Sequence, residues 1–306
     1  MGEPLPSRAL AARRHARRQR PFHHLFVLPA LAIFALFVAY PIGWVAYTSL
    51  FAVSLHGVSH WAGLGNYRSV LDNPTFWIVV RNMFYWALIT IPVQMVIGGL
   101  LAWAVEEYTH RSRALFRTLF FVPVITSVVV IAIVWSNIYA PYYGILQQGL
   151  SEIGIHFQTA LLGSAGTAIF AIIIVNVWEW TGFSMLMYIA GLKTIPVQLL
   201  EAARMDGASG INLARFVLVP ALSGVNRSLL LLGVIGTLQT FPLVFLMTDG
   251  GPDHASEVFG TYIFRHGFVL GQTGYASALS VVVLVIALVM TLLQIRFLGS
   301  KFSLKG

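Results

Sequence analysis

One charged side chain stands inside a long apolar stretch of the sequence, in the triplet Trp178-Glu179-Trp180. A carboxylate near the middle of a bilayer costs about 3 kcal/mol on insertion scales, so such a residue usually faces a cavity or a partner. A carboxylate beside an aromatic ring suits a sugar-like solute, because it accepts hydrogen bonds from hydroxyls while the ring covers a C–H face. Asn176 lies close enough along the chain to take part.

The sequence therefore predicts a solute path at Asn176, Trp178 and Glu179, and the alternative is that Glu179 pairs structurally with water or a partner chain. Trp178 and Trp180 cannot both line one cavity, because neighbouring helical residues point about 100° apart. Gln239 and Phe241, in a later apolar stretch, are further candidates for the path. A Gln in such a place can equally hold two helices together.

The sequence contains no recognisable catalytic, metal or nucleotide site. Gly191-Leu-Lys-Thr194 resembles the end of a phosphate-binding loop, but Leu192 stands where a Gly is required and no strand precedes it. The nine histidines form no His-Glu-x-x-His pattern, and there is no cysteine to act as a nucleophile or metal ligand. We therefore expect no enzymatic activity, no metal and no cofactor on this chain.

A second polar segment, Glu201-Ala-Ala-Arg-Met-Asp-Gly207, follows the apolar stretch that holds Glu179. Thr194 can cap a short helix that has Pro196 in its first turn, and Gly207 can end that helix in the left-handed conformation. The Leu199-Leu200 pair supplies apolar anchors, while the alanines leave a surface that another backbone can approach closely. The helix either docks on a partner or lies as an ordinary amphipathic helix at the membrane interface.

The spacing of this segment resembles the EAA signature of the membrane subunits of binding-protein-dependent ABC importers. Three residues separate Glu-Ala-Ala from the Gly, and Pro220 follows thirteen positions later. The resemblance is to the carbohydrate-type permeases, the maltose and glycerol-3-phosphate group, although Val217 and Val219 stand where Ile and Leu are usual. It implies a cytoplasmic coupling helix that sits in a cleft of an ATPase subunit and includes Glu201, Ala202, Ala203, Asp206 and Gly207.

The composition places both polar segments in an integral membrane protein. The chain has 306 residues, of which 58% are hydrophobic and only 10% charged, and its mean hydropathy is +0.79. A soluble domain has about a quarter of its residues charged. The apolar runs are long and uninterrupted, which indicates helices and excludes an outer-membrane barrel. The predicted fold class is therefore all-α and membrane-spanning.

Six apolar runs are each long enough to cross a bilayer, which takes about 20 helical residues. The first three contain Pro41, Pro92 and Pro123, and we expect a kink at Tyr40-Pro41. Six spans put both chain ends on one side of the membrane. The runs are Leu25–Phe51, Phe76–Val105, Leu115–Tyr139, Ala168–Leu192, Gly224–Met247 and Tyr275–Leu298.

The distribution of basic residues predicts the orientation. Sixteen of the nineteen Lys and Arg fall in the N-terminal tail, in the loops after the second and fourth spans and at the C-terminus. The opposite side has only Arg68, Arg81 and Arg265. By the positive-inside rule both termini and the docking segment are cytoplasmic. The net charge of +8 is therefore topological and gives no reason to expect nucleic acid as a partner.

We predict three parts: a basic cytoplasmic tail over residues 1–24, a six-span permease domain over 25–298 with its coupling loop at 193–221, and a cytoplasmic tail over 299–306. The arginines of the first tail can contact anionic lipid. The external segment from Asp249 to Gly274 is longer than a helix connection needs, and long loops are more often functional.

The family resemblance extends over most of the chain. It is carried also by Phe116–Pro123, by Trp178 with Thr181-Gly-Phe183, by Ala190–Leu192 before Ile195-Pro196, and by Phe241–Thr248 before Gly250-Gly-Pro252. No second copy of the docking segment occurs, so the chain would form half of a pore. The resemblance implies a multi-pass permease subunit of a carbohydrate importer in the cytoplasmic (inner) membrane of a prokaryote.

The implied partners are a second permease in a heterodimer, an ABC ATPase dimer that carries ATP and Mg, and a substrate-binding protein that docks on the external side. The main alternative is a secondary transporter, which would hold its own coupling-ion site and typically show internal repeats. Another membrane-embedded protein, such as an enzyme, would need His, Asp or Glu clustered at one depth in several spans. Neither pattern is present in the sequence.

Overall fold

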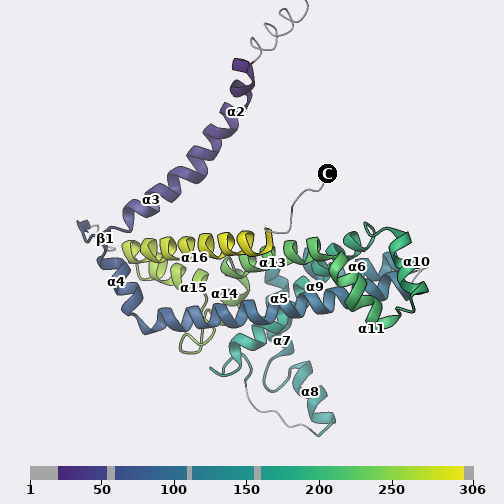
Figure 1. Ribbon diagram of the computed structural model, residues 1–306. Helices are drawn as coiled ribbons and strands as arrows, with labels where there is room; N and C mark the ends of the chain where they lie inside the picture. The colour runs from purple at the N-terminus through teal and green to yellow at the C-terminus, as the bar shows by residue number, and fades with distance from the viewer. Residues whose placement is uncertain (1–19, 54–58, 109–111, 155–159, 300–306) are drawn as a thin grey trace, which may run out of the picture.

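The protein is described by a computed structural model for residues 20–53, 59–108, 112–154 and 160–299. The basic tail predicted over residues 1–24 and the C-terminal tail over 299–306 lie almost wholly outside these ranges. The helices α5 (Pro74–Tyr108), α9 (Ala168–Leu192), α13 (Ser223–Leu238) and α16 (Thr273–Gly299) form a bundle in which α13 packs on both α5 and α16 (Figure 1). The bounds of α5, α9 and α16 match the second, fourth and sixth predicted spans closely.

Helix α9 is the central element of the bundle. More than half of its 25 residues are buried, and it packs against α5, α13 and a helix of the third predicted span, α6 (Arg113–Ile125). Small residues allow this close packing: a Cβ on Gly98 of α5 would lie 2.7 Å from the Ser184 side chain of α9. Two apolar clusters form the core, one toward each end of the bundle.

The first predicted span is one helical rod with an irregular middle. It consists of α2 (Arg20–Phe34), the π-helical turn η1 (Ala35–Ala39) and α3 (Tyr40–Thr48). The wide turn lies directly before Pro41, which lacks the N–H that a regular helix would use there. The kink predicted at Tyr40-Pro41 is thus realised as a π turn. The rod projects away from the bundle (Figure 1), and its side chains from Val27 to Trp44 are exposed.

The rod leads into a small cap at one end of the bundle. Strand β1 (Phe51–Val53) pairs antiparallel with β2 (Ser59–Trp61), with Phe51 opposite Trp61, and α4 (Gly65–Asp72) follows. The Asn66 amide donates hydrogen bonds to the carbonyl oxygens of Ser49 (2.8 Å) and Phe51 (2.9 Å). Helix α5 then begins at Pro74, where a missing N–H costs nothing, and Asn73 accepts a hydrogen bond from the Thr75 N–H.

The third predicted span is broken rather than straight. Helix α6 ends at Ile125, α7 (Val128–Ile138) starts after Thr126 and Ser127, and the two axes differ by 95°. Thr126 and Ser127 have ψ angles of 141° and 131°, which interrupt the helical hydrogen bonds. The prediction of one helix over Leu115–Tyr139 is therefore wrong, because two extended residues follow the turn that contains Pro123. After α7, the helix α8 (Ile145–Glu152) projects below the bundle in the view of Figure 1.

The fifth predicted span, Gly224–Met247, is also divided. Helix α13 stops at Leu238 and α14 (Pro242–Thr248) begins at Pro242, with Gln239, Thr240 and Phe241 between them. Pro242 cannot donate to the carbonyl four residues earlier, so a continuous helix is disfavoured. Beyond α14, a loop leads to α15 (Phe259–Phe264) and the π turn η3 (Arg265–Val269).

Four helices of the described residues are long and apolar enough to cross a membrane: Val27–Thr48, Pro74–Glu107, Ala168–Leu192 and Thr273–Arg296. Two bent pairs raise the number to six if each pair is one span. These pairs are α6 with α7, and Gly210–Ala221 with α13, whose two parts differ in direction by 72°.

Candidate functional site

The predicted docking helix exists and lies at the end of the bundle opposite the β hairpin (Figure 1). It is α10 (Val197–Met205), followed by α11 (Gly210–Leu213), the π turn η2 (Ala214–Leu218) and α12 (Val219–Ala221). The helix does not begin as predicted: its N-cap is Pro196, and the Thr194 hydroxyl donates instead to the Gly191 carbonyl oxygen. The local turn at the end of α9 uses that hydroxyl, so Thr194 cannot cap α10.

The C-terminal end of α10 agrees with the prediction. Gly207 has a φ angle of +83°, the left-handed conformation that Gly adopts without steric cost. The Ala208 N–H bonds to the Ala203 carbonyl oxygen, and the Gly207 N–H to that of Arg204, which together form a Schellman motif. Nothing lies within 4 Å of a Cβ placed on Gly207. The chain therefore turns sharply here and leaves free space outside the turn.

Helix α10 is held on the bundle by few side chains. Leu200 packs against the apolar cluster that contains Ile195, Leu218 and Leu222, whereas Leu199 is exposed, so only one of the two predicted anchors is an anchor. An Nη2 atom of Arg204 lies 3.3 Å from the Glu107 carboxylate at the end of α5. The sequence alone did not single out this pair, because nothing in the spacing links residues 107 and 204.

The outer side of α10 is open to solvent. Glu201, Ala202, Asp206 and Gly207 are exposed, Ala203 is half-buried, and the apolar side chain of Met205 is 88% exposed. Exposed apolar side chains continue beyond the helix at Ile211 and Phe216. A short helix that leaves small and apolar groups uncovered has the shape of a docking surface.

Glu179 is buried in the middle of α9, where its side chain is 7% exposed. Among the described residues, no hydrogen bond or ion pair involves its carboxylate. A buried charge without a partner is unfavourable, so such a group is expected to meet water, a solute or another chain.

The two tryptophans beside Glu179 turn away from it. Trp178 is half-exposed, and its ring meets that of Trp135 of α7 at a centroid distance of 5.4 Å, while Trp180 is half-exposed on another side of the helix. Helical geometry alone explains this, because successive residues point about 100° apart. Asn176 is held by Gln94 of α5, whose amide lies 3.2 Å from the Asn176 carbonyl oxygen and 3.3 Å from Oδ1. Gln94 is a polar residue in an apolar span. That pattern could have predicted a contact with a second polar residue such as Asn176.

Gln239 and Phe241 occupy the break between α13 and α14. The Gln239 side chain is exposed, and the Phe241 ring stacks on that of Phe245 at 5.1 Å. No hydrogen bond or ring contact joins these two residues to Asn176, Trp178 or Glu179 within the described ranges, although α13 and α14 both pack on α9. Non-helical backbone at membrane depth is tolerated where it is buried in protein or lines a water-filled cavity.

No group of three or more His, Asp or Glu residues that could hold a metal ion occurs in the described part of the chain.

Long apolar helices around a buried core define a multi-pass membrane protein. The family of inner membrane components of binding-protein-dependent transport systems matches residues 10–298. The chain belongs to this family and is a permease subunit of an ABC importer. A secondary transporter is therefore not favoured.

Known relatives cover nearly the whole chain. It is 37% identical over 278 residues to the probable ABC transporter permease protein YurN of Bacillus subtilis (strain 168), a match that spans 90% of this chain and 94% of the relative. It is 27% identical to the sn-glycerol-3-phosphate transport system permease protein UgpA of Yersinia pestis over 91% of this chain and 94% of that protein. A bacterial ABC transporter involved in alginate import has the same fold, with a TM-score of 0.82, 21% identity, and coverage of 96% of this chain and 100% of that one.

Proposed function

We propose that this chain is the membrane subunit of an ATP-driven importer for a sugar or sugar-like solute, and that α10 is the helix through which an ATPase moves it. The observation that carries this proposal is the uncovered surface of α10, which ends in the Schellman turn at Gly207. The coupling residues are Glu201, Ala202, Ala203, Asp206 and Gly207. ATP and Mg would be bound by the ATPase, so this chain itself has no catalytic role.

The proposed topology has six spans and both termini in the cytoplasm of a prokaryotic cell. It counts the rod α2–α3, α5, the bent pair α6–α7, α9, the divided span α13–α14 and α16. The arrangement is supported by the positions of α10 at one end of the bundle and of the β hairpin at the other (Figure 1). The proposed parts keep the bounds 1–24, 25–298 and 299–306, with the coupling loop at 193–221.

The proposed solute path includes Asn176, Glu179 and Gln239, with Gln94 added because it holds Asn176. Trp178 and Phe241 contact aromatic rings of their own chain and would border the path rather than bind the solute. The solute class is supported by relatives named for sn-glycerol-3-phosphate transport. A second permease would complete the pore, and a substrate-binding protein would deliver the solute from outside.

The experiment is to purify this chain from its native membrane with a mild detergent and identify what accompanies it. We expect a second permease and an ABC ATPase, and we expect ATP hydrolysis in reconstituted vesicles to rise when a substrate-loaded binding protein is added. Uptake of a panel of labelled sugars and polyol phosphates then identifies the solute. Purification without an ATPase, together with ion-driven uptake, would overturn the proposal.

A further inference from the structure

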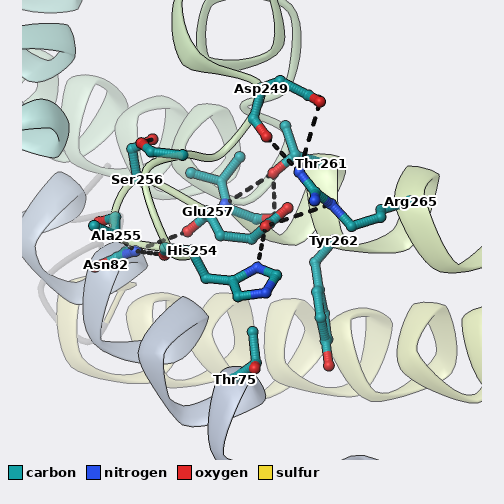
Figure 2. A network of polar contacts seen from close by, with 12 residues as sticks. Thr75, Asn82, Asp249, His254, Ala255, Ser256, Glu257, Thr261, Tyr262 and Arg265 are labelled. Atoms are coloured by element: carbon teal, nitrogen blue, oxygen red, sulfur yellow. Dashed lines mark hydrogen bonds and ion pairs between the residues drawn. The ribbon is translucent and has the colours of Figure 1, made fainter. Parts of the chain in front are cut away.

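A fully buried carboxylate lies at the external end of the bundle, far along the chain from both proposed sites. The Glu257 side chain is 0% exposed and closes the loop segment Asp249–Glu257, which connects α14 to α15. Its Oε2 atom lies 2.7 Å from His254 Nδ1 and 3.7 Å from Arg265 Nε (Figure 2). Removing a carboxylate from water costs several kcal/mol, so it stays charged only beside such partners.

Arg265 connects the two ends of this segment. While its Nε faces Glu257, its Nη2 atom donates to the Asp249 carbonyl oxygen at 2.5 Å and lies 3.6 Å from the Asp249 carboxylate. One guanidinium at the start of η3 thus contacts the first and the last residue of the segment, as Figure 2 shows. The planar fork of Arg suits such a bridge, since it points several donors in set directions.

Asn82 joins the segment to α5. Its buried amide lies 2.9 Å from the Glu257 carbonyl oxygen, 3.0 Å from that of Ala255 and 3.4 Å from that of His254. At the other edge, the hydroxyl oxygens of Thr248 and Ser256 are 2.8 Å apart. The segment is therefore held to the second span, to the end of the fifth and to η3 at the same time.

The backbone of the segment is strained. Asp249, Asp253 and His254 have φ angles of 48°, 46° and 61°, and each such residue costs about 1 kcal/mol or more relative to an ordinary conformation. Strained conformations of this kind persist only where the surroundings hold them. A Cβ on Gly250 would lie 2.8 Å from the Glu257 carboxyl group, so the carboxylate also fills the space under the turn.

Two further titratable groups lie beside the segment. Burial raises the pKa of Tyr262, and burial lowers the pKa of His266, whose ring lies 4.5 Å from those of Tyr262 and Tyr275. The groups in contact with the Glu257 carboxyl group are His254 and Arg265, and Arg265 also contacts the Asp249 carboxylate.

We propose that Glu257 is a positioning residue that fixes Asp249–Glu257 as a rigid external platform for the substrate-binding protein, and that this platform stays closed throughout the transport cycle. The inference rests on the proposed function for the identity of the partner. The platform presents the exposed carboxylates of Asp249 and Asp253 outward, which suits a partner with basic groups at the contact.

The first test replaces Glu257→Gln in the complete importer reconstituted in vesicles. Glutamine keeps the size of the side chain and loses its charge, so Arg265 and His254 no longer hold the segment in one arrangement. The concentration of loaded binding protein that half-saturates ATP hydrolysis should rise about tenfold or more, a typical coupling between sites, while the maximal rate changes little. Asp72→Asn is the matched control, because Asp72 is an external carboxylate paired with Arg68 at 3.5 Å but largely exposed.

A wild-type half-saturating concentration in Glu257→Gln would overturn the inference. A general structural defect gives a different result, namely less assembled complex and a lower maximal rate, and would overturn the positioning role as well. If no binding protein stimulates the wild-type importer, the proposed function fails instead of the inference.

The second test uses the absence of cysteine from the chain. The double variant Thr248→Cys with Ser256→Cys places two sulfurs where two oxygens lie 2.8 Å apart. We expect the pair to oxidise readily and the oxidised importer to transport at the rate of the reduced one. Transport that stops on oxidation and returns with reductant would show that the segment must open, and sulfurs that never join would contradict the closed arrangement.

Each single cysteine variant controls for oxidation elsewhere in the complex. Amide hydrogen exchange of residues 249–257 gives a readout that needs no binding protein. Slow exchange in both the nucleotide-free and the ATP-bound importer supports a rigid platform, and fast exchange in either state overturns it.

Discussion

At the scale of single residues, Glu179 is a buried polar residue, whereas Gly207 is an exposed residue with an unusual backbone conformation. Glu179 is buried, and no hydrogen bond or ion pair within the described residues involves its carboxyl group. Burying a polar group without a partner is costly, so we expect a group from outside this chain to meet it. Gly207 is exposed and has nothing within 4 Å of a Cβ placed on it, yet its φ of +83° admits few other residues. In both cases the residue is poorly explained by the subunit alone, which is what contact with a solute or a partner predicts.

Replacing Glu179→Gln should reduce transport about tenfold, because a hydrogen bond to a charged group is worth about 1.5–3 kcal/mol and the neutral amide retains only part of it. Assembly should be unchanged, since no described contact depends on the charge. Uptake of labelled solute and co-purification of the partners measure the two effects. Glu152→Gln, an exposed carboxylate on α8, is the control. Normal transport of every accepted solute would show that Glu179 has a structural role and does not contact the solute.

The variant Gly207→Asp should insert normally but hold or stimulate the ATPase poorly. The left-handed backbone costs about 1 kcal/mol with any side chain, and the added carboxylate projects beside Asp206 from the docking surface. We expect binding-protein-stimulated hydrolysis to fall about tenfold or more, which corresponds to about 1.4 kcal/mol of lost interaction.

The matched control for this variant is Gly154→Asp. Gly154 has a φ of +80° and an equally open surrounding, but it lies after α8 and outside the proposed coupling segment, so only the backbone strain is reproduced. Equal losses in the two variants would show that strain alone is responsible and that α10 is an ordinary interfacial helix.

At the scale of helices, the packing of α6 on α9 depends on Gly182. A Cβ there would lie 1.9 Å from the Phe120 carbonyl oxygen and 2.7 Å from its carbon, and backbone atoms cannot move aside as a flexible side chain can. Gly182→Ala should therefore lower the free energy of unfolding by about 3 kcal/mol, the upper end of overpacking effects. Thermal denaturation of the purified chain measures it. Gly149→Ala in α8, where nothing lies within 4 Å, should be neutral or stabilising by up to about 1 kcal/mol.

Two adjacent glutamates at the end of α5 test how burial decides the value of an ion pair. Glu106 is 20% exposed and pairs with Arg113 and Arg117, whereas Glu107 is 44% exposed and pairs with Arg204 of α10. We expect Glu106→Gln to cost about 2 kcal/mol, below the 3–5 kcal/mol of a fully buried pair, and Glu107→Gln less than about 1 kcal/mol. Chemical or thermal denaturation compares them, and equal losses would contradict the argument.

At the scale of the whole molecule, the proposed orientation can be tested because the chain has no native cysteine. Tyr142→Cys, an exposed position after α7, should react with a membrane-impermeant thiol reagent added to intact cells, and Lys193→Cys before α10 should not. The positive-inside rule is the physical reason. Both positions should react after permeabilisation, which serves as the control, and the opposite pattern in intact cells would overturn the topology. Gly250 would be a poor reporter site, because it packs against buried Glu257.

The rod formed by α2, η1 and α3 is largely uncovered by the rest of the chain. Its side chains from Val27 to Trp44 are exposed although they are apolar, so lipid or another subunit must cover them in the membrane. Such a surface is compatible with the proposed pairing with a second permease.

The sequence by itself determined the class of the molecule. Composition and run length are properties of residues that do not depend on the fold, and they predicted the helical membrane protein and the bounds of α5, α9 and α16. The family was predicted from the resemblance of the Glu201–Gly207 segment and other short motifs. Local backbone chemistry was equally predictable at Gly207, because a positive φ depends on a single residue. Thr194 and Leu199 were misplaced, since which hydroxyl caps a turn and which of two leucines turns inward depend on packing around them.

Only the tertiary structure decided where helices break and which distant groups meet. The interruptions at Thr126-Ser127 and Gln239–Phe241 fall inside runs that are long enough to cross a bilayer as one helix, so run length alone does not reveal them. The contacts of Gln94 with Asn176, of Glu107 with Arg204 and of Asn82 with the loop that ends at Glu257 each join residues 82 to 175 positions apart. Such pairs form where two helices pack face to face. Which faces pack is determined by the shapes of all the side chains together.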